Sequence, residues 1–147
     1  MESDSDSNLS VKTRRSTYQP LTTLTGATGI VYWESEGVCF PDAHWNDIVS
    51  VLAIWWLQSV KRLEHGETQV RFEFMDGPYV VRCRRTGSLL SGEFVENKQR
   101  ELIIGQWSAP LADVSREVRR FASKVLRFCD EKQISSRDIT VLRSELM

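Results

Sequence analysis

The segment between Thr68 and Arg85 constrains the fold more than any other part of the chain. Apolar and polar side chains alternate from Thr68 to Met75, and they alternate again from Tyr79 to Arg85. Such alternation is typical of a strand that buries one face. Asp76-Gly77 separates the two runs, and this dipeptide favours the left-handed backbone of a tight hairpin turn. The sequence therefore predicts an antiparallel hairpin.

Two further strands are predicted to extend this hairpin into a meander. A turn at 86–88 precedes a strand over 89–96, and a turn at 96–99 precedes a strand over 101–107. Shorter strand candidates, rich in β-branched and aromatic residues, occupy 29–33 and 38–40. Because side chains alternate along a strand, Arg82 and Arg84 are expected on the sheet face opposite the apolar residues.

Apolar residues spaced three and four apart predict three helices. The first is expected over 42–64 with Asp42 as its N-cap, and the second begins near Ser108. A short last helix is expected to begin with a capping box at Ser135 and Asp138. The expected fold class is α+β, an antiparallel sheet of about four to six strands with two long helices and a short C-terminal helix packed on it.

The composition predicts one folded domain preceded by a polar arm. The 147 residues are 41% hydrophobic, which is enough for a core of ordinary size. Residues 1–25 are mainly Ser, Thr, Asp and basic residues, and such a segment buries too little apolar area to offset the entropy of ordering it. We therefore expect 1–25 to be a flexible tail and 26–147 to be a single α+β domain.

The charge balance counts against nucleic acid as a partner. The 19 basic and 20 acidic residues give a net charge of −1, whereas proteins that bind phosphates usually have a basic excess. Cys39, Cys83 and Cys129 are widely spaced and do not cluster with histidine, so we expect no metal and no cofactor. An odd cysteine count without a disulfide framework favours a reducing compartment.

The composition of the N-terminal residues and the length of the apolar runs indicate the location of the protein in the cell. The N-terminal residues are acidic and Ser-rich, unlike a signal peptide. The longest apolar run is about ten residues, and a membrane span needs about 20. We expect a cytoplasmic protein that has no membrane contact.

Four carboxylates lie close together in the sequence around the first turn and the first helix start. They are Glu34, Glu36, Asp42 and Asp47. One interpretation is that these carboxylates stabilise the turn and the start of the helix through hydrogen bonds and the helix dipole. A second is that they form an acidic surface that binds a basic partner. A third is that they form a metal site or an acid–base catalytic site. No nucleophile elbow, P-loop or dinucleotide-binding motif is found, so we expect the protein not to be an enzyme.

Three tryptophans belong to the first predicted helix region. Trp45 and Trp56 fall on its apolar stripe, and Trp55 lies about 100° around the helix from Trp56. Trp55 is therefore either enclosed by the rest of the domain or part of an aromatic protein interface.

Several short segments of the sequence resemble those of small immunity proteins of bacterial polymorphic toxin systems. They are His44-Trp45-Asn46-Asp47, Trp55-Trp56-Leu57 and the stretch from Phe74 to Tyr79, within an element order that covers about 30–130. The resemblance implies a cytosolic α+β domain without catalytic residues that binds a cognate toxin domain and blocks it. We therefore predict a non-catalytic, immunity-like protein-binding module. The predicted partner-binding residues are Glu34, Glu36, Asp42, Trp45, Asp47, Trp55, Arg82 and Arg84.

Two alternatives stay open, and self-association is compatible with each. One is a nucleic-acid-associated protein that uses the arginine-rich strands and the basic second helix. Another is a small-ligand-binding protein or enzyme with an acidic site near Asp42. A homodimer is compatible with each of these, because the first helix has more apolar surface than one sheet face requires.

Overall fold

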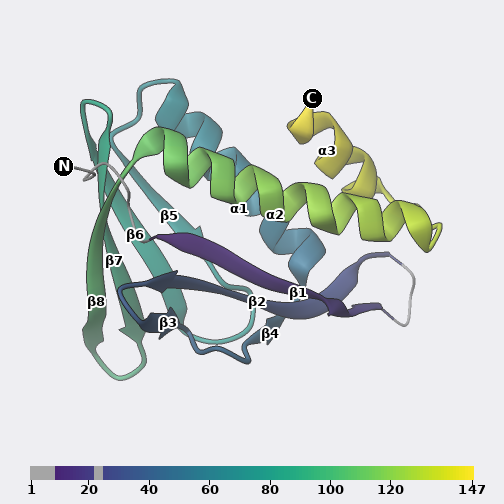
Figure 1. The fold of residues 1–147 in the computed structure, drawn as a ribbon, viewed down its shortest axis with the longest axis horizontal. Coiled ribbons are helices and arrows are strands. Elements are labelled where there is room, and N and C mark those ends of the chain that lie inside the picture. The colour runs from purple at the N-terminus through teal and green to yellow at the C-terminus, as the bar shows by residue number, and fades with distance from the viewer. Residues whose placement is uncertain (1–8, 22–24) are drawn as a thin grey trace.

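A computed structural model describes residues 9–21 and 25–147 of the protein (Figure 1). Over these residues the chain forms eight strands and three helices. In chain order they are β1 (Ser10–Pro20), β2 (Ala27–Ser35), β3 (Val38–Phe40), β4 (Asn46–Asp47), α1 (Val49–Glu64), β5 (Gln69–Glu73), β6 (Tyr79–Thr86), β7 (Leu89–Asn97), β8 (Glu101–Pro110), α2 (Leu111–Glu131) and α3 (Arg137–Leu146).

The predicted α+β class is confirmed, with the strands divided between two antiparallel sheets. The first sheet has the order β1-β2-β3, and β4 also pairs with β2. The second has the order β5-β6-β7-β8, which is the predicted meander. The strands on either side of α1 pair only among themselves, so each half of the chain builds its own sheet.

The predicted hairpin is formed by β5 and β6. Arg71 pairs with Arg82 and Phe72 pairs with Val81, so charged and apolar residues occupy opposite faces as the alternation requires. The backbone N–H of Phe74 donates to the carbonyl of Tyr79 at 3.3 Å beyond the end of β5. Gly77 has a φ of 101°, which glycine adopts without steric strain.

The predicted flexible tail is wrong for the part of it that forms β1. Residues 10–20 pair with β2, and Leu9, Val11 and Tyr18 are buried. The backbone N–H of Val11 donates to the carboxylate of Glu117 on α2 at 3.0 Å. These contacts come from residues far away in the sequence, which the local composition of the segment does not reveal. The rest of the predicted tail, residues 1–8 and 22–24, lies outside the described residues.

The first helix begins seven residues later than predicted, at Val49 rather than at Asp42. Asn46 and Asp47 instead form β4 and pair with β2, and the N–H of Val31 donates to the carbonyl of Trp45 at 3.0 Å. The sheet thus uses the backbone groups that a longer helix would have needed. The N-terminus of α2 is shifted in the same way, because β8 continues through Pro110.

Aromatic side chains from both sheets and from α1 meet in the core. Trp33 of β2 is fully buried, and its ring centroid lies 5.6 Å from that of Trp56, 4.9 Å from that of Phe72 and 6.0 Å from that of Trp107. These side chains come from β2, α1, β5 and β8, so the two sheets share one core. Edge-on and tilted ring pairs at such distances are favourable beyond the area they bury.

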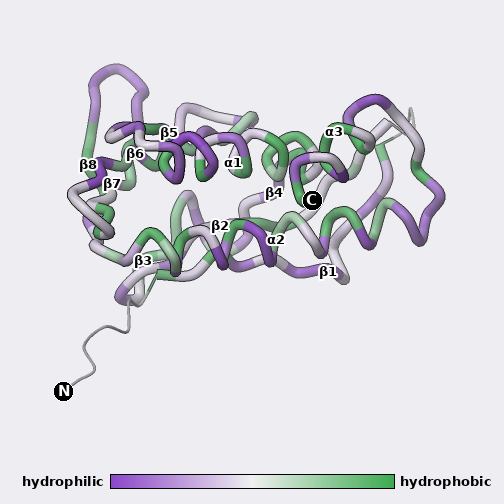
Figure 2. Tube along the Cα trace, turned by 90° about the horizontal axis from the view of Figure 1, so that it is seen from above, coloured by the Kyte–Doolittle hydropathy of each residue, from purple (hydrophilic) through white to green (hydrophobic). Residues whose placement is uncertain are grey.

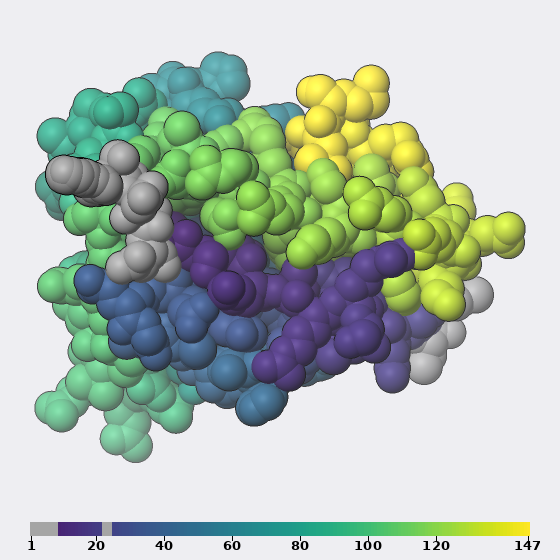
Figure 3. Space-filling view, in the orientation of Figure 1, coloured from purple at the N-terminus to yellow at the C-terminus, as the bar shows by residue number. Residues whose placement is uncertain are grey.

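Each long helix covers a different sheet. Seen from above, α1 lies on the side of β5, and α2 lies on the side of β1 (Figure 2). Figure 3 shows α2 in contact with β1 along the face turned to the viewer. Helix α3 packs against α1 and α2, where the carboxylate of Glu145 accepts hydrogen bonds from Lys61 and Gln58. Within residues 9–21 and 25–147, no helix covers the outer face of the second sheet (Figure 2).

Candidate functional site

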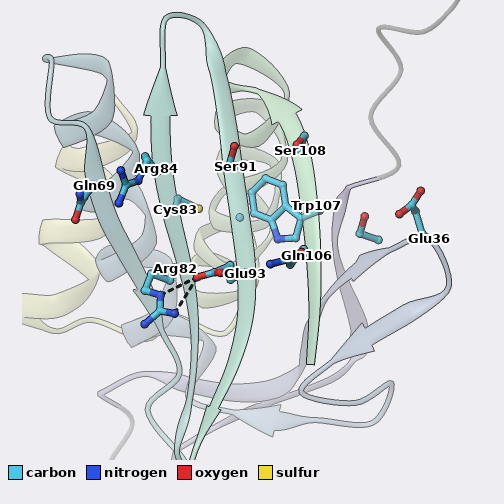
Figure 4. Close-up of a pocket in the computed structure, with 12 residues that line it drawn as sticks. Glu36, Gln69, Arg82, Cys83, Arg84, Ser91, Glu93, Gln106, Trp107 and Ser108 are labelled. Carbon is cyan, nitrogen blue, oxygen red and sulfur yellow. Dashed lines mark hydrogen bonds and ion pairs between the residues drawn. The ribbon is translucent and has the colours of Figure 1, made fainter. Parts of the chain in front are cut away.

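A groove crosses the second sheet and brings together three of the predicted partner-binding residues, Glu36, Arg82 and Arg84. It has a volume of about 740 Å³ and lies across β6, β7 and β8, with the turn after β2 at one side (Figure 4). Its walls are mainly polar. The lining residues are Ser35, Glu36, Gln69, Arg82, Cys83, Arg84, Ser91, Gly92, Glu93, Gln106, Trp107 and Ser108.

Arg82 is held in the groove wall by two carboxylates. Its Nε donates to Glu93 at 3.0 Å, and its two Nη atoms donate to the two oxygens of Glu101 at 2.9 Å each. The hydrogen bonds to Glu101 and then to Glu93 raise the pKa of the Arg82 guanidinium above its usual value, and the same contact lowers the pKa of Glu101. This bidentate geometry fixes the guanidinium on the sheet, so Arg82 organises the charges of this face.

Gly92 makes room for the indole of Trp107 on the core side of the sheet, beneath the groove. A Cβ atom at position 92 would lie 2.0 Å from Cε2 of Trp107, so no other residue fits there without moving the ring. The Trp107 side chain is buried, and its Nε1 has no hydrogen-bond partner among the described residues. Burial also raises the pKa of the neighbouring Cys83 thiol, which keeps it protonated.

An apolar edge lies next to the groove, on β8. Leu102, Ile103 and Ile104 are 43%, 47% and 47% exposed, and we call these three residues the β8 edge. Strand β8 is the last strand of its sheet, and a bulge between Phe94 and Val95 of β7 interrupts its register here. This surface was not predicted from the sequence. Three consecutive apolar residues in a predicted strand that should alternate are the signal that could have revealed it.

Charged residues surround the β8 edge. Glu101 precedes it and is paired with Arg82, and Lys98 in the preceding turn pairs with Glu96 at 2.8 Å. Apolar residues inside a charged rim are the usual composition of a protein-binding surface.

Two of the predicted partner-binding residues make contacts that hold the fold together. Asp47 is 2% exposed, and its carboxylate accepts hydrogen bonds from Nε1 of Trp45 at 2.9 Å, from the N–H of Ile48 at 2.7 Å and from the N–H of Asp76 at 3.2 Å. It therefore ties β4 and the start of α1 to the hairpin loop. Trp45 is half-buried, and its ring packs edge-on against Tyr79 at 5.1 Å.

Glu34 and Asp42 do not join a common acidic site with Asp47. Glu34 lies 3.8 Å from Nζ of Lys12 and accepts a weak contact from Sγ of Cys39 at 3.7 Å. Asp42 is exposed in the turn before β4, where it accepts a hydrogen bond from the N–H of His44 at 2.7 Å. The four predicted carboxylates therefore have separate local partners or, for Glu36, a place at the groove.

Trp55 is exposed, as the interface interpretation requires, but it lies apart from the groove. It is 39% exposed on the solvent side of α1, one turn before Gln58. Its neighbour Trp56 is fully buried and donates from Nε1 to the carbonyl of Glu73 at 2.8 Å. The two adjacent indoles are thus divided between surface and core.

Two classes of feature are missing from the part of the chain that the structure describes. Within residues 9–21 and 25–147, no three histidine, cysteine or acidic side chains come close enough to hold a metal ion. None of the helices in these ranges has the length and apolar character needed to cross a membrane.

The comparisons with known proteins leave the site to be interpreted from its own geometry. Neither the protein-family models, nor the curated protein sequences, nor the solved structures contain a match to this chain.

Proposed function

We propose that the protein is a non-catalytic binding module of the immunity type, which binds a cognate toxin domain and neutralises it by covering its functional surface. The observation that carries this proposal is the β8 edge, because three adjacent aliphatic side chains there are almost half exposed on the edge strand of the sheet. A surface of this kind is a contact site for another protein chain.

The backbone of β8 adds a second reason for a protein partner. Its residues pair with β7 on one side, and no backbone hydrogen bond within the described ranges is made from its other side. An edge strand can accept an extended segment of a partner as an additional strand, with affinity from the main chain and specificity from side-chain contacts. The bulge opposite Phe94 and Val95 lies beside these aliphatic residues, and bulges are frequent at sheet edges and next to functional sites.

The partner would be anchored by the aliphatic residues and oriented by the charged rim. A few well-packed anchors usually supply most of the affinity of an interface, and paired charges at its border supply specificity. Leu102, Ile103 and Ile104 are the anchors on this chain, with Arg82 and Glu101 as the bordering pair. Inhibition then needs no catalytic residue.

The experiment is a protection assay with a matched pair of variants. The toxin domain that this proposal expects to be encoded beside the protein is expressed in bacteria with the wild type, with Ile103→Glu or with Leu89→Glu. Leu89 is the control because it is 46% exposed in the same sheet but pairs with Pro110 at the opposite end of the β7–β8 hairpin. A charge at position 103 should abolish growth protection and complex formation, whereas the same charge at position 89 should leave both intact.

Two results would contradict the proposal. A wild-type protein that neither binds the toxin domain nor restores growth would refute the immunity-type function. Equal protection by Ile103→Glu and wild type would refute the role of the β8 edge. Thermal unfolding of both variants identifies a loss of binding that comes only from misfolding.

A further inference from the structure

Four polar side chains form a row across the outer face of the second sheet. Gln69 pairs with Arg84, Arg84 with Ser91, and Ser91 with Ser108. Paired residues of adjacent antiparallel strands have Cβ atoms about 5 Å apart, so the row crosses all four strands. All four side chains are exposed and line the groove (Figure 4). We call these residues the polar row.

The polar row has no partners of its own. Within residues 9–21 and 25–147, none of its four side chains makes a hydrogen bond or an ion pair, although Arg82 stands two residues from Arg84 on the same face with two carboxylates bound. Glu93 and Glu101 are both bound to Arg82 and not to Arg84. Among the described residues, Arg84 is therefore a groove cation without a direct ion pair, and the Arg82–Glu93–Glu101 cluster beside it carries a net charge of −1.

The hydrogen-bonding capacity of the row fits an anion. A guanidinium offers a planar set of N–H donors, each serine hydroxyl adds a donor, and the glutamine amide adds two. Glu36, the remaining acid of the groove, lies on the turn after β2, on the far side of β7 and β8 from Arg84 (Figure 4). A guanidinium flanked by hydroxyl donors is well suited to the oxygens of a carboxylate or phosphate group.

The size of the groove is also compatible with a small ligand. Its volume of about 740 Å³ lies within the range of small-molecule sites.

We propose that the polar row is a binding site for an oxyanion, the carboxylate or phosphate group of a small ligand, with Arg84 as its charge partner and Ser91 and Ser108 as hydrogen-bond donors. The site is separate from the β8 edge and does not depend on a toxin partner. Loss of oxyanion binding would leave growth protection unchanged, so the two proposals fail independently.

The test is a titration of the full chain with inorganic phosphate and with succinate at constant ionic strength, followed by calorimetry and by amide chemical shifts. Saturable binding with shifts at positions 69, 84, 91 and 108 is expected. Arg84→Gln should weaken it at least tenfold, and Arg84→Lys should restore part of it because the charge returns without the planar donor set. Tighter binding of phosphate would identify a phosphoryl ligand, and tighter binding of succinate a carboxylate ligand.

The matched control is Arg127→Gln on α2. Arg127 is also exposed and makes no ion pair in the part of the chain that the structure describes, but it lies outside the groove. The Arg127→Gln variant should bind phosphate and succinate with the same affinity as the wild-type protein. The proposal is overturned if neither probe saturates, or if Arg84→Gln and Arg127→Gln weaken binding equally, because either result means only general attraction between anions and surface charge.

Discussion

Replacing Tyr18 with Phe should change how the stability of the protein depends on alkaline pH. Tyr18 lies on β1 with its ring edge-on to Phe128 of α2, at a centroid distance of 5.5 Å. Burial raises the pKa of its phenol from 10.0 to about 12. Between these values the unfolded chain loses the proton and the folded chain keeps it, so stability is complete below pH 10 and is lost as the pH rises towards 12.

The magnitude follows from the two pKa values. A shift of about two units corresponds to about 2.7 kcal/mol once the pH exceeds both of them. At pH 11 the unfolded phenol is mostly ionised and the folded one is mostly neutral, which gives a loss of about 1.4 kcal/mol relative to pH 8. The Tyr18→Phe variant has no phenol and escapes this loss.

The assay is urea unfolding of wild type and Tyr18→Phe at both pH values, followed by tryptophan fluorescence. The difference in unfolding free energy between the two proteins should shift by about 1.4 kcal/mol in favour of the variant between pH 8 and pH 11. Thr13→Val is the control, because it removes the hydrogen bond between Thr13 and the Tyr18 hydroxyl but keeps the phenol. A difference that stays constant with pH, or a Thr13→Val protein that behaves like Tyr18→Phe, would refute the reasoning.

Three other substitutions test the hydrogen bonds and packing described above. Asp47→Asn should lower the unfolding free energy by about 3 kcal/mol in urea, because an amide cannot accept from Trp45, Ile48 and Asp76 together; a loss under 1 kcal/mol would contradict this role. Gly92→Ala should cost about 2 kcal/mol and alter tryptophan fluorescence by displacing Trp107, and an unchanged spectrum would speak against the close contact. Ser136→Ala should cost about 1 kcal/mol in thermal unfolding, because the hydroxyl caps the N–H of Ile139 at 3.3 Å; an unchanged melting temperature would exclude the cap.

The sequence was most informative where local pattern and long-range packing agree. The alternation on both sides of Asp76-Gly77 predicted β5 and β6 and placed Arg82 and Arg84 on one face, as the pairing of Arg82 with Arg71 and of Arg84 with Gln69 confirms. The apolar stripe of the second long helix likewise predicted α2, because its spacing matches the single face that the helix buries.

The failures occurred where distant residues decide the structure. Residues 10–20 have a composition that does not indicate a strand, and they become ordered through β2 and α2. The helix pattern extended back to Trp45 because that side chain is also packed, although it precedes the short strand β4 and not a helix. The spacing of hydrophobic residues indicates which side chains are buried, but it does not distinguish a helical backbone from the extended backbone of β4.

The candidate site was predicted only in part. Arg82, Arg84 and Glu36 share the groove, whereas Asp47 had to be reassigned to the fold because sequence proximity to other acids says nothing about burial. The β8 edge was missed because exposure of an apolar residue depends on where the sheet ends, which a single sequence does not state.

The hydrogen bond from Val11 to Glu117 has a consequence for the order in which a ribosome completes this fold. The two residues are separated by 106 positions, so the N-terminal strand is synthesised long before the helix that protects its edge. At about 5 to 20 residues per second the delay is about 5 to 20 seconds. Throughout that interval the unpaired edge of β1 is accessible to other nascent chains. In a chain truncated before α2, this edge stays accessible permanently.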